Sequence, residues 1–284
     1  MQLALRNWDL SIGSGQPLFC ILGLNVLEDL GLALETAREL KKVAAQLDLP
    51  FVFKASFDKA NRSSFKSFRG PGLNEGLKIL AEVKARENLP IATDLHEVEQ
   101  AAPVAAVADL VQIPAFLCRQ TDLVVAAAKA TAEAGGLLHI KKAQFLAPLD
   151  CHSILRKVEE AAGKDLVILC ERGTSFGYNN LVVDMLSIPA MKQLGAPVTI
   201  DATHAVQLPG ARADGDGVSS GGRREGVAVI AASAVAAGAD GVFLEFHPDP
   251  EKAKCDGPSC LPLSAAKDLL GRLKALHGTL NSAP

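Results

Sequence analysis

Eight short apolar segments recur along the chain, and amphipathic segments separate them. The apolar segments cover residues 17–23, 51–57, 90–95, 110–116, 137–142, 166–173, 197–204 and 241–247. Most are continuous apolar runs, which is typical of strands buried on both faces of a parallel sheet. The amphipathic segments cover residues 30–47, 73–86, 123–134, 153–162, 185–193, 226–237 and 264–276. Strands that alternate with helices predict a parallel sheet with helices outside.

Eight such strands within about 250 residues match a (β/α)8 barrel, or TIM barrel. We therefore predict a single α/β domain over residues 1–284, in which residues 2–12 form an additional N-terminal β-hairpin. An open, doubly wound sheet is the alternative. That fold is favoured by a Gly-x-Gly-x-x-Gly motif after a strand, and no such motif follows a strand in this sequence.

The composition excludes several classes of protein. The chain has 284 residues, 49% of them hydrophobic, so it can bury a large core and is not intrinsically disordered. Its net charge of −3 gives no basic surplus for nucleic acid. No run of about 18 uncharged apolar residues predicts a membrane segment, and the first residues do not resemble a signal peptide. Six scattered cysteines without a Cys-x-x-Cys pair indicate reduced thiols in a cytoplasmic protein.

Polar and charged residues gather where the predicted strands end. From the second strand to the eighth they are Lys54, Ser56 and Lys59; Asp94 and His96; Gln112 and Arg119; Lys141, Lys142 and Gln144; Glu171 and Arg172; Asp201 and His204; Glu245 and His247. In a (β/α)8 barrel the chemistry takes place at the carboxyl ends of the strands. The sequence therefore predicts one shared polar mouth.

Cations are prominent among these strand-end residues. They are Lys54, Lys59, Arg62, Arg119, Lys141 and Arg172. A single Lys or Arg is more often a solvated surface charge, but an ammonium group inside an apolar strand is costly unless it is paired. A chain of slightly negative charge that concentrates cations at one end is suited to focus phosphate and carboxylate ligands there.

A long loop follows the seventh predicted strand. Residues 211–225, with the sequence ARADGDGVSSGGRRE, are rich in Gly and Ser and show no secondary-structure pattern. A loop of this length favours a lid over the mouth, in which Arg223 and Arg224 supply further cations. A surface insertion without function is the alternative.

Several longer motifs resemble a known enzyme family. They are FVFKASFDKANRSS (51–64), QIPAFLCRQTDL (112–123), CERGTSFGYNNLVVDM (170–185), DATHAVQ (201–207), SGGRRE (220–225) and EFHPDPEKAKCDGPS (245–259). Together they closely resemble the 3-deoxy-D-manno-octulosonate 8-phosphate synthases, also called 2-dehydro-3-deoxyphosphooctonate aldolases. The resemblance implies a (β/α)8 barrel that forms a homotetramer. It implies condensation of phosphoenolpyruvate with D-arabinose 5-phosphate for lipopolysaccharide (KDO) biosynthesis.

The resemblance also implies roles for individual residues. Lys54, Ser56 and Lys59 match positions that hold the phosphoenolpyruvate carboxylate. Its phosphate site is matched by Lys141, Arg172 and the backbone near Ala115, with Gln112 and Gln144 nearby. Asn61, Arg62 and Ser63 match groups that receive the arabinose phosphate and its hydroxyls, and Arg119 matches an arginine that reaches a neighbouring subunit's site. Asp94 and His204 match polar groups around the reacting carbons and water.

A metal is not expected. The metal-dependent members of the family use a Cys, a His, a Glu and an Asp, and the last three match His204, Glu245 and Asp256. The Cys position is occupied by Asn25, whose neutral carboxamide is a poor ligand compared with a thiolate. We therefore predict the metal-independent class and no cofactor, with a weak three-ligand site as the alternative. His204, Asp94 and Glu245, in that order, are our candidates to activate water.

Three other functions compete with this interpretation. A 3-deoxy-D-arabino-heptulosonate 7-phosphate synthase would use erythrose 4-phosphate and a metal, but the sequence from Lys59 to Arg62, Lys-Ala-Asn-Arg, differs from the pattern of that relative. A Schiff-base aldolase would use Lys54 or Lys141. A non-catalytic barrel would have no reason to carry the polar mouth. His139, inside an apolar strand, is expected to be a core histidine with satisfied hydrogen bonds.

Overall fold

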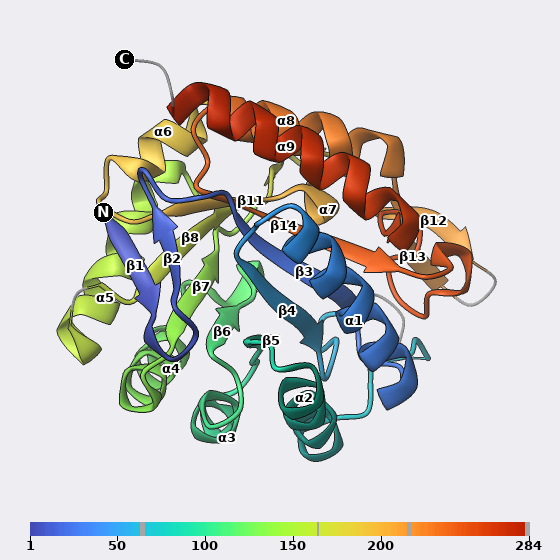
Figure 1. Cartoon of the computed structure of the whole chain (residues 1–284), viewed down its shortest axis with the longest axis horizontal. Coiled ribbons are helices and arrows are strands. Elements are labelled where there is room, and N and C mark those ends of the chain that lie inside the picture. Colours follow the sequence, from blue (N-terminus) through green and yellow to red (C-terminus); the bar gives the residue numbers. More distant parts are fainter. Residues whose placement is uncertain (63–65, 164, 215–216, 282–284) are drawn as a thin grey trace.

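The computed structural model describes residues 1–62, 66–163, 165–214 and 217–281. Its centre is a closed parallel barrel, seen obliquely in Figure 1. The barrel strands are β3 (Phe19–Val26), β4 (Phe51–Ser56), β5 (Ile91–Asp94), β6 (Leu110–Ile113), β7 (Leu137–Lys141), β8 (Val167–Glu171), β11 (Val198–Asp201) and β14 (Gly241–His247). Each strand pairs in parallel with the next, and β14 pairs with both β11 and β3. The predicted (β/α)8 barrel is therefore confirmed.

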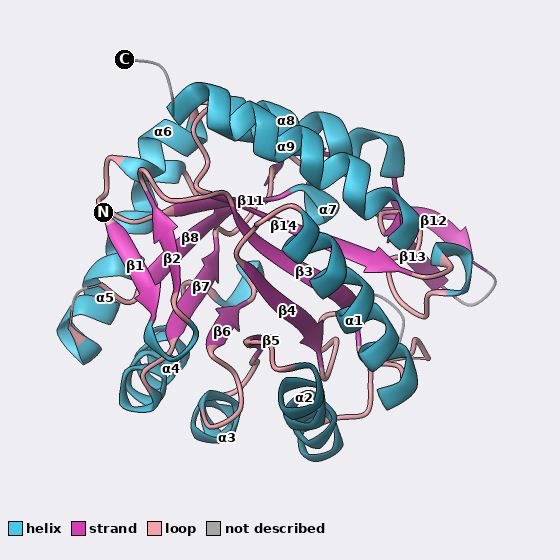
Figure 2. Ribbon diagram, in the orientation of Figure 1, coloured by secondary structure: helices cyan, strands magenta, loops and turns pink. Residues whose placement is uncertain are grey.

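Helices cover the outside of the barrel (Figure 2). They are α1 (Leu30–Gln46), α2 (Leu73–Glu87), α3 (Ala101–Ala105), α4 (Thr121–Ala134), α5 (His152–Ala162), α6 (Ser187–Lys192), α8 (Val227–Ala236) and α9 (Ala266–Asn281). The sequence analysis did not predict α3, which is only five residues long and too short for a helical period to show. Within the described residues, no helix is both long and apolar enough to cross a membrane.

One predicted strand is too long. The segment 197–204 was expected to be entirely extended, but β11 ends at Asp201 and the short helix α7 (Ala202–Ala205) follows it. The carboxylate of Asp201 accepts a hydrogen bond from the backbone N–H of His204 at 2.9 Å, as an N-cap does. The cap turns the chain at the strand end, and this turn brings the His204 side chain over the mouth of the barrel.

The predicted N-terminal hairpin is present as β1 (Gln2–Leu5) and β2 (Leu10–Gly13), which pair in antiparallel fashion. Leu3, Leu5 and Ile12 bury their side chains. The indole of Trp8 donates to the carboxylate of Asp109 at 2.8 Å, immediately before β6. The hairpin therefore docks at the amino ends of the strands, the end of the barrel opposite to the β12–β13 hairpin (Figure 1).

Two aspartates hold the strands together at that same end. Asp109 accepts hydrogen bonds from the backbone N–H of Ile91 and from the Lys84 ammonium, both at 2.9 Å. Asp240 does the same with Val198 and Lys192, both at 2.8 Å. Because charge-assisted bonds to a buried carboxylate are strong, these two contacts tie β5 to β6 and β11 to β14. The carboxyl ends of the strands are thus left to form the site.

The lid region differs from the prediction. The segment 211–225 was expected to lack secondary structure, but residues 211–214 and 217–222 belong to two antiparallel strands, β12 (Gln207–Asp214) and β13 (Gly217–Gly222). Glycine and serine give no alternating apolar pattern, so backbone pairing of this kind is invisible in the sequence. At Gly222 a Cβ atom would lie 2.1 Å from the Ser259 hydroxyl oxygen, so only glycine lets the hairpin approach the loop that follows β14.

A second, smaller hairpin supports the first. It consists of β9 (Thr174–Ser175) and β10 (Leu181–Val182), and it follows β8. The amide of Asn179 donates to the carbonyl oxygen of Pro209 at 2.6 Å, and Arg223 donates to the amide oxygen of Asn180 at 2.8 Å. Arg224 pairs with Glu251 at 2.8 Å. Both arginines of the predicted lid therefore make contacts within the protein.

Candidate active site

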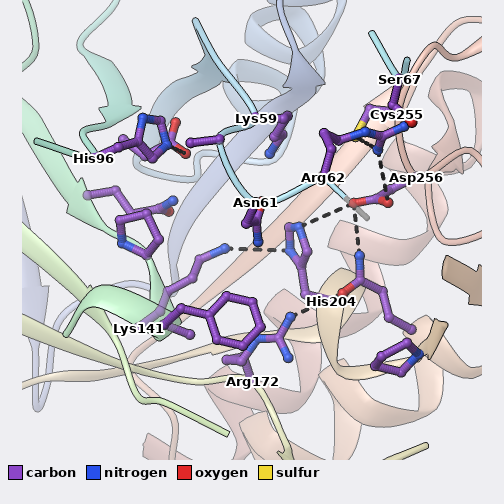
Figure 3. A pocket seen from close by; sticks show the side chains of 18 of the residues that line it. Lys59, Asn61, Arg62, Ser67, His96, Lys141, Arg172, His204, Cys255 and Asp256 are labelled. Carbon is purple, nitrogen blue, oxygen red and sulfur yellow. Dashed lines mark hydrogen bonds and ion pairs between the residues drawn. The ribbon is translucent and has the colours of Figure 1, made fainter. Parts of the chain in front are cut away.

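A cavity of about 660 Å³ opens at the carboxyl ends of the barrel strands. Figure 3 shows it from close by. Most of the residues that the sequence analysis singled out line this cavity: Lys59, Asn61, Arg62, Asp94, Gln112, Ala115, Lys141, Gln144, Arg172, His204 and Asp256. The predicted polar mouth is therefore confirmed as a real concavity, to which strands from all around the barrel contribute.

The remaining predicted residues lie elsewhere. Asn25, Lys54, Ser56 and Glu245 are buried below the cavity rather than in its lining. Arg119 is exposed and lies outside the cavity as the described residues define it. Ser63 falls outside the described part of the chain. Of the six strand-end cations, Lys59, Arg62, Lys141 and Arg172 line the cavity. Lys54 lies deeper in the barrel beside Glu245, and Arg119 follows the short helical turn Ala115–Leu117.

The cavity rests on a buried ion pair. The ammonium of Lys54, 1% exposed, donates to Glu245 at 2.9 Å and to the carbonyl oxygen of Asn25 at 3.2 Å. Burial lowers the pKa of Lys54, and the Glu245 carboxylate opposes this shift. Burial acts against ionisation of Glu245 as well, but the neighbouring His204 and Lys54 side chains lower its pKa to about 2. The pair is therefore a fixed plus and minus charge under the site.

His204 is held by Asp201, which the sequence analysis placed at the polar mouth without giving it a role. Asp201 places one carboxylate oxygen 2.7 Å from Nδ1 of His204 and 2.5 Å from the Lys141 ammonium. Although burial opposes its ionisation, the neighbouring His204 and Lys141 side chains hold the pKa of Asp201 well below its usual range. With Nδ1 engaged by Asp201, Nε2 of His204 points toward the Asn25 amide at 3.4 Å, Glu245 at 3.6 Å and Asp256 at 3.9 Å. The available signal was the position of Asp201 at the end of the same strand.

An aromatic ring completes the base of this group. The ammonium of Lys141 lies 3.8 Å from the centre of the Phe243 ring, and the Lys54 ammonium lies 5.3 Å from it. The negative face of an aromatic ring attracts a cation without offering it a hydrogen-bond acceptor. Phe243 therefore stabilises both ammonium groups and leaves the remaining N–H donors of Lys141 free to bind a ligand.

One side of the cavity has unused hydrogen-bonding capacity. Arg172, 6% exposed, donates to the amide oxygen of Gln207 at 3.1 Å. Its Nη1 and the amide oxygen of Gln144 are buried and find no partner among the described residues. Burial lowers the pKa of Arg172, and Asp201 opposes this shift. A buried guanidinium nitrogen without a partner is costly unless a ligand satisfies it, so this side suits an anion.

The opposite side combines cations with carboxylates. Burial disfavours the charge on Lys59, but Glu245 and Asp94 outweigh it and raise the pKa of this lysine. Asp94 lies 3.3 Å from His96; burial again opposes ionisation, yet the hydrogen bond and charge of His96, followed by Lys59, hold its pKa well below the usual range. Arg62 contacts the Cys255 sulfur at 2.7 Å and lies 3.9 Å from Asp256. Lys59 and Arg62 therefore face the ligand as cations.

The residues around Asn25 do not fit a metal ion. Its amide nitrogen lies 2.5 Å from Glu245, 3.2 Å from Asp256 and 3.4 Å from Nε2 of His204. An amide nitrogen has hydrogen atoms and no lone pair to offer, so it occupies the centre of the three groups as a donor. Gln207 donates to the same oxygen of Asp256 at 2.8 Å. Among the described residues, no group of three or more His, Cys, Asp or Glu side chains could hold a metal.

These features define a class: a (β/α)8 barrel with a cavity at its mouth that four cationic side chains line. The chain belongs to the DAHP synthetase I family, whose model matches residues 2–279. It is 54% identical over 283 residues to the 2-dehydro-3-deoxyphosphooctonate aldolases of Azotobacter vinelandii and Ectopseudomonas mendocina, covering 100% of this chain and 98% of each relative. The enzyme of that name from Shewanella baltica is 54% identical over 273 residues, covering 96% of this chain and 94% of the relative.

His139 is the core histidine that the sequence predicted. Its ring nitrogens lie 2.9 Å from the Thr199 hydroxyl and 3.3 Å from the Gln112 amide oxygen, and its ring stacks on Phe243 with 6.0 Å between the centres. Burial, followed by the charge of Lys141, lowers the pKa of His139 from 6.5 to about 3. His139 is therefore neutral in the folded protein at neutral pH.

This lowered pKa makes stability depend on pH. Because the folded pKa of about 3 lies below the unfolded value of 6.5, the unfolded chain binds one more proton between these values, and unfolding becomes easier as the pH falls. The slope from this one group approaches about 1.4 kcal/mol per pH unit. We expect His139→Gln to reduce the slope of the unfolding free energy by about that amount between pH 4 and 6, measured by urea denaturation. The control is His152→Gln, at an exposed histidine, which should keep the wild-type slope. Equal slopes for His139→Gln and the wild type would contradict the assignment.

Proposed function

We propose that this chain condenses phosphoenolpyruvate with D-arabinose 5-phosphate and water. The products are 3-deoxy-D-manno-octulosonate 8-phosphate and inorganic phosphate, and the sugar acid would serve lipopolysaccharide biosynthesis. The names of the relatives support this activity. The observation that carries it is a cavity with cations on two sides of His204. In Figure 3 Lys141 lies to the left of His204 and Arg172 lies below it, whereas Lys59 and Arg62 lie above it.

Phosphoenolpyruvate would bind in the deeper part of the site. Its phosphate would lie against Lys141, Arg172 and the backbone at Ala115, with the amides of Gln112 and Gln144 nearby; these residues all line the cavity. The unused Nη1 of Arg172 supports this placement, because a guanidinium group can hold a phosphate through two parallel hydrogen bonds. The carboxylate would lie against Lys59, with Lys54 and Ser56 contributing from beneath.

The aldose phosphate would bind nearer the opening. Asn61, Arg62 and Ser63 would receive its phosphate and hydroxyl groups. Among these, Asn61 and Arg62 lie at the cavity wall. The aldehyde would then face C3 of the enol ester, so that two anions are held in register for reaction. Orientation of this kind can supply a large part of a rate enhancement.

The bond changes follow from the substrates. C3 of phosphoenolpyruvate attacks the aldehyde carbon, whose oxygen takes up a proton and becomes a hydroxyl, and the new C–C bond leaves positive character at C2. Water adds to C2 and loses one proton. The C2–O bond to phosphate then breaks, the C2 hydroxyl gives its remaining proton to the departing phosphate, and C2 becomes the ketone. His204 is our candidate to take the proton, because Asp201 orients its ring. Asp94 and Glu245 follow it, and Glu245 is the weakest base because Lys54 and Asn25 occupy its oxygens.

A single substitution tests the role of His204. We expect His204→Ala to lower kcat by about 10²- to 10⁴-fold, the usual contribution of a general base, with a smaller effect on either KM. His152→Ala, at the exposed histidine, is the matched control. Phosphate release under saturating substrates is the measurement. An unchanged turnover number in His204→Ala would remove this residue from the proton transfer.

A Schiff-base mechanism is not favoured. It would require a neutral lysine amine that reaches the substrate carbonyl. Lys141 is paired with the Asp201 carboxylate at 2.5 Å, and Lys54 is paired with Glu245 below the cavity. Both lysines therefore serve as fixed cations in the proposal.

The reaction would proceed without a metal or other cofactor. The support is chemical: the Asn25 amide donates to Glu245 and Asp256, the oxygens that a metal would need. A carboxylate that accepts such a hydrogen bond is not available as a ligand in the same direction. Asn25 and Asp256 would then contribute by holding His204 and Glu245 in place.

The decisive assay combines two aldose phosphates with a chelator. We expect rapid phosphate release from phosphoenolpyruvate with arabinose 5-phosphate, at least 100-fold slower release with erythrose 4-phosphate, and no loss of activity in excess EDTA. A preference for the four-carbon sugar would favour the heptulosonate synthase instead. Activity that EDTA abolishes and a divalent metal restores would overturn the metal-independent assignment.

The active form would be a cytoplasmic homotetramer. Large apolar side chains are exposed on the loops that follow β6, β7 and β8: Phe116, Phe145, Leu149, Phe176 and Tyr178. Exposed apolar residues gathered on one side of a chain are typical of an interface. Arg119, which follows Phe116 and Leu117 closely in the chain, is exposed, and it is not among the described residues that line the cavity of its own subunit. This position supports its proposed reach into a neighbouring subunit's sugar-phosphate site.

Mixed oligomers test the shared site. Arg119→Ala and Lys141→Ala should each be nearly inactive alone. Co-expressed, they should recover measurable activity, because some interfaces combine an intact Arg119 with an intact Lys141 site. Co-expression of two Lys141→Ala copies with different tags is the control. Absence of recovery in hybrids that purify with both tags would show that Arg119 does not act across subunits.

A further inference from the structure

We infer that Lys142 and Glu171 are positioning residues for the anion site. They form a buried pair that joins the loop after β7 to the loop after β8. Neither side chain lines the cavity as described, so neither touches a ligand, but each is directly beside a residue that does. The identity of the anion rests on the proposed function, whereas the geometry of the pair does not.

Glu171 fixes the backbone that carries Arg172. One of its carboxylate oxygens accepts hydrogen bonds from the backbone N–H groups of Arg172 at 2.9 Å and Gly173 at 2.6 Å. The residue is the last of β8 and is 1% exposed. A carboxylate bonded in this way sets the direction in which the chain leaves the strand. It thereby determines where the guanidinium of Arg172 enters the cavity.

Lys142 fixes the neighbouring loop. Its ammonium donates to the carbonyl oxygens of Ala143 and Leu146, each at 3.2 Å, and lies 3.5 Å from the same oxygen of Glu171. The side chain is fully buried. These carbonyl groups flank Gln144, whose amide lines the cavity. The lysine thus closes a turn around Gln144 and binds that turn to Glu171.

Burying these two charges is unfavourable for stability, and this supports a role other than stabilising the fold. A lysine and a glutamate taken out of water are rarely better for stability than apolar residues of the same size. Here two backbone N–H groups and the Lys142 ammonium converge on a single carboxylate oxygen. The Gln144 carbonyl oxygen also accepts a hydrogen bond from the backbone N–H of Ser175 at 3.0 Å, so the two loops are joined twice. Two anion-binding side chains on separate loops are in this way held in one arrangement.

The test separates stability from positioning. Lys142→Met and Glu171→Gln each leave one buried charge without its partner, so both should lower the midpoint of urea unfolding. The double variant removes both charges and should recover most of that midpoint, while the amide oxygen introduced by Glu171→Gln still accepts the two backbone hydrogen bonds. We nevertheless expect the double variant to keep a KM for phosphoenolpyruvate about tenfold above wild type, with the KM for arabinose 5-phosphate within twofold. In an Arg172→Lys background, the double change should add less than twofold to the KM for phosphoenolpyruvate.

Each result has a defined meaning. A wild-type KM for phosphoenolpyruvate in the double variant would reduce the pair to a stability element and overturn the inference. A further tenfold loss in the Arg172→Lys background would show that the pair does not act through Arg172. If the double variant does not fold, Lys142→Met alone, which removes the contacts of the lysine with the Gln144 turn and with Glu171, gives the same comparison of the two KM values. A wild type that turns over neither substrate would reject the proposed function. Calorimetric titration with phosphoenolpyruvate would then make the same comparison as a ratio of Kd values.

Discussion

The structure depends on the pairing of charges that lie inside a barrel mouth. An ion removed from water is costly unless an opposite charge and further hydrogen bonds compensate it. Lys54 with Glu245, and Lys141 with Asp201, meet this condition at 2.9 and 2.5 Å. The pairs lie at the carboxyl ends of β4, β14, β7 and β11. Because the strands are rigid and hydrogen-bonded all around, the charges keep their places without a ligand.

This arrangement explains how a chain with a net charge of −3 can bind anions. Attraction by the whole molecule is not needed when a few cations are aimed at one cavity. Lys59, Arg62, Lys141 and Arg172 line it, and Arg62 and Lys141 lie beside the carboxylates of Asp256 and Asp201. Asp201 has two roles at this site: it pairs with Lys141, and it orients His204.

Much of the fold could be predicted from the sequence, for reasons that also set the limits. The eight buried strands are continuous apolar runs and were all recognised, whereas α3 and the β12–β13 hairpin were not. The hairpin is made by backbone pairing in a glycine-rich segment, which leaves no side-chain period. In the site, the strand ends indicated the mouth, and the family resemblance named most of its residues. Neither the strand ends nor the resemblance indicated how deep in the barrel each side chain lies. Lys54 and Lys59 are five residues apart, and only the fold shows that one lies below the cavity and the other within it.

The carboxylates at the mouth differ in how many of their oxygens already have hydrogen-bond partners. Both oxygens of Glu245 are engaged, one by Lys54 and the other by Asn25, so this residue acts as a fixed negative charge. One oxygen of Asp256 accepts from both Asn25 and Gln207. Asp94 differs, because one of its oxygens faces His96 and the other has no partner among the residues described. Asp94 also lines the cavity, and its pKa is held well below the usual range, so it keeps an acceptor oxygen of a kind that Glu245 no longer has.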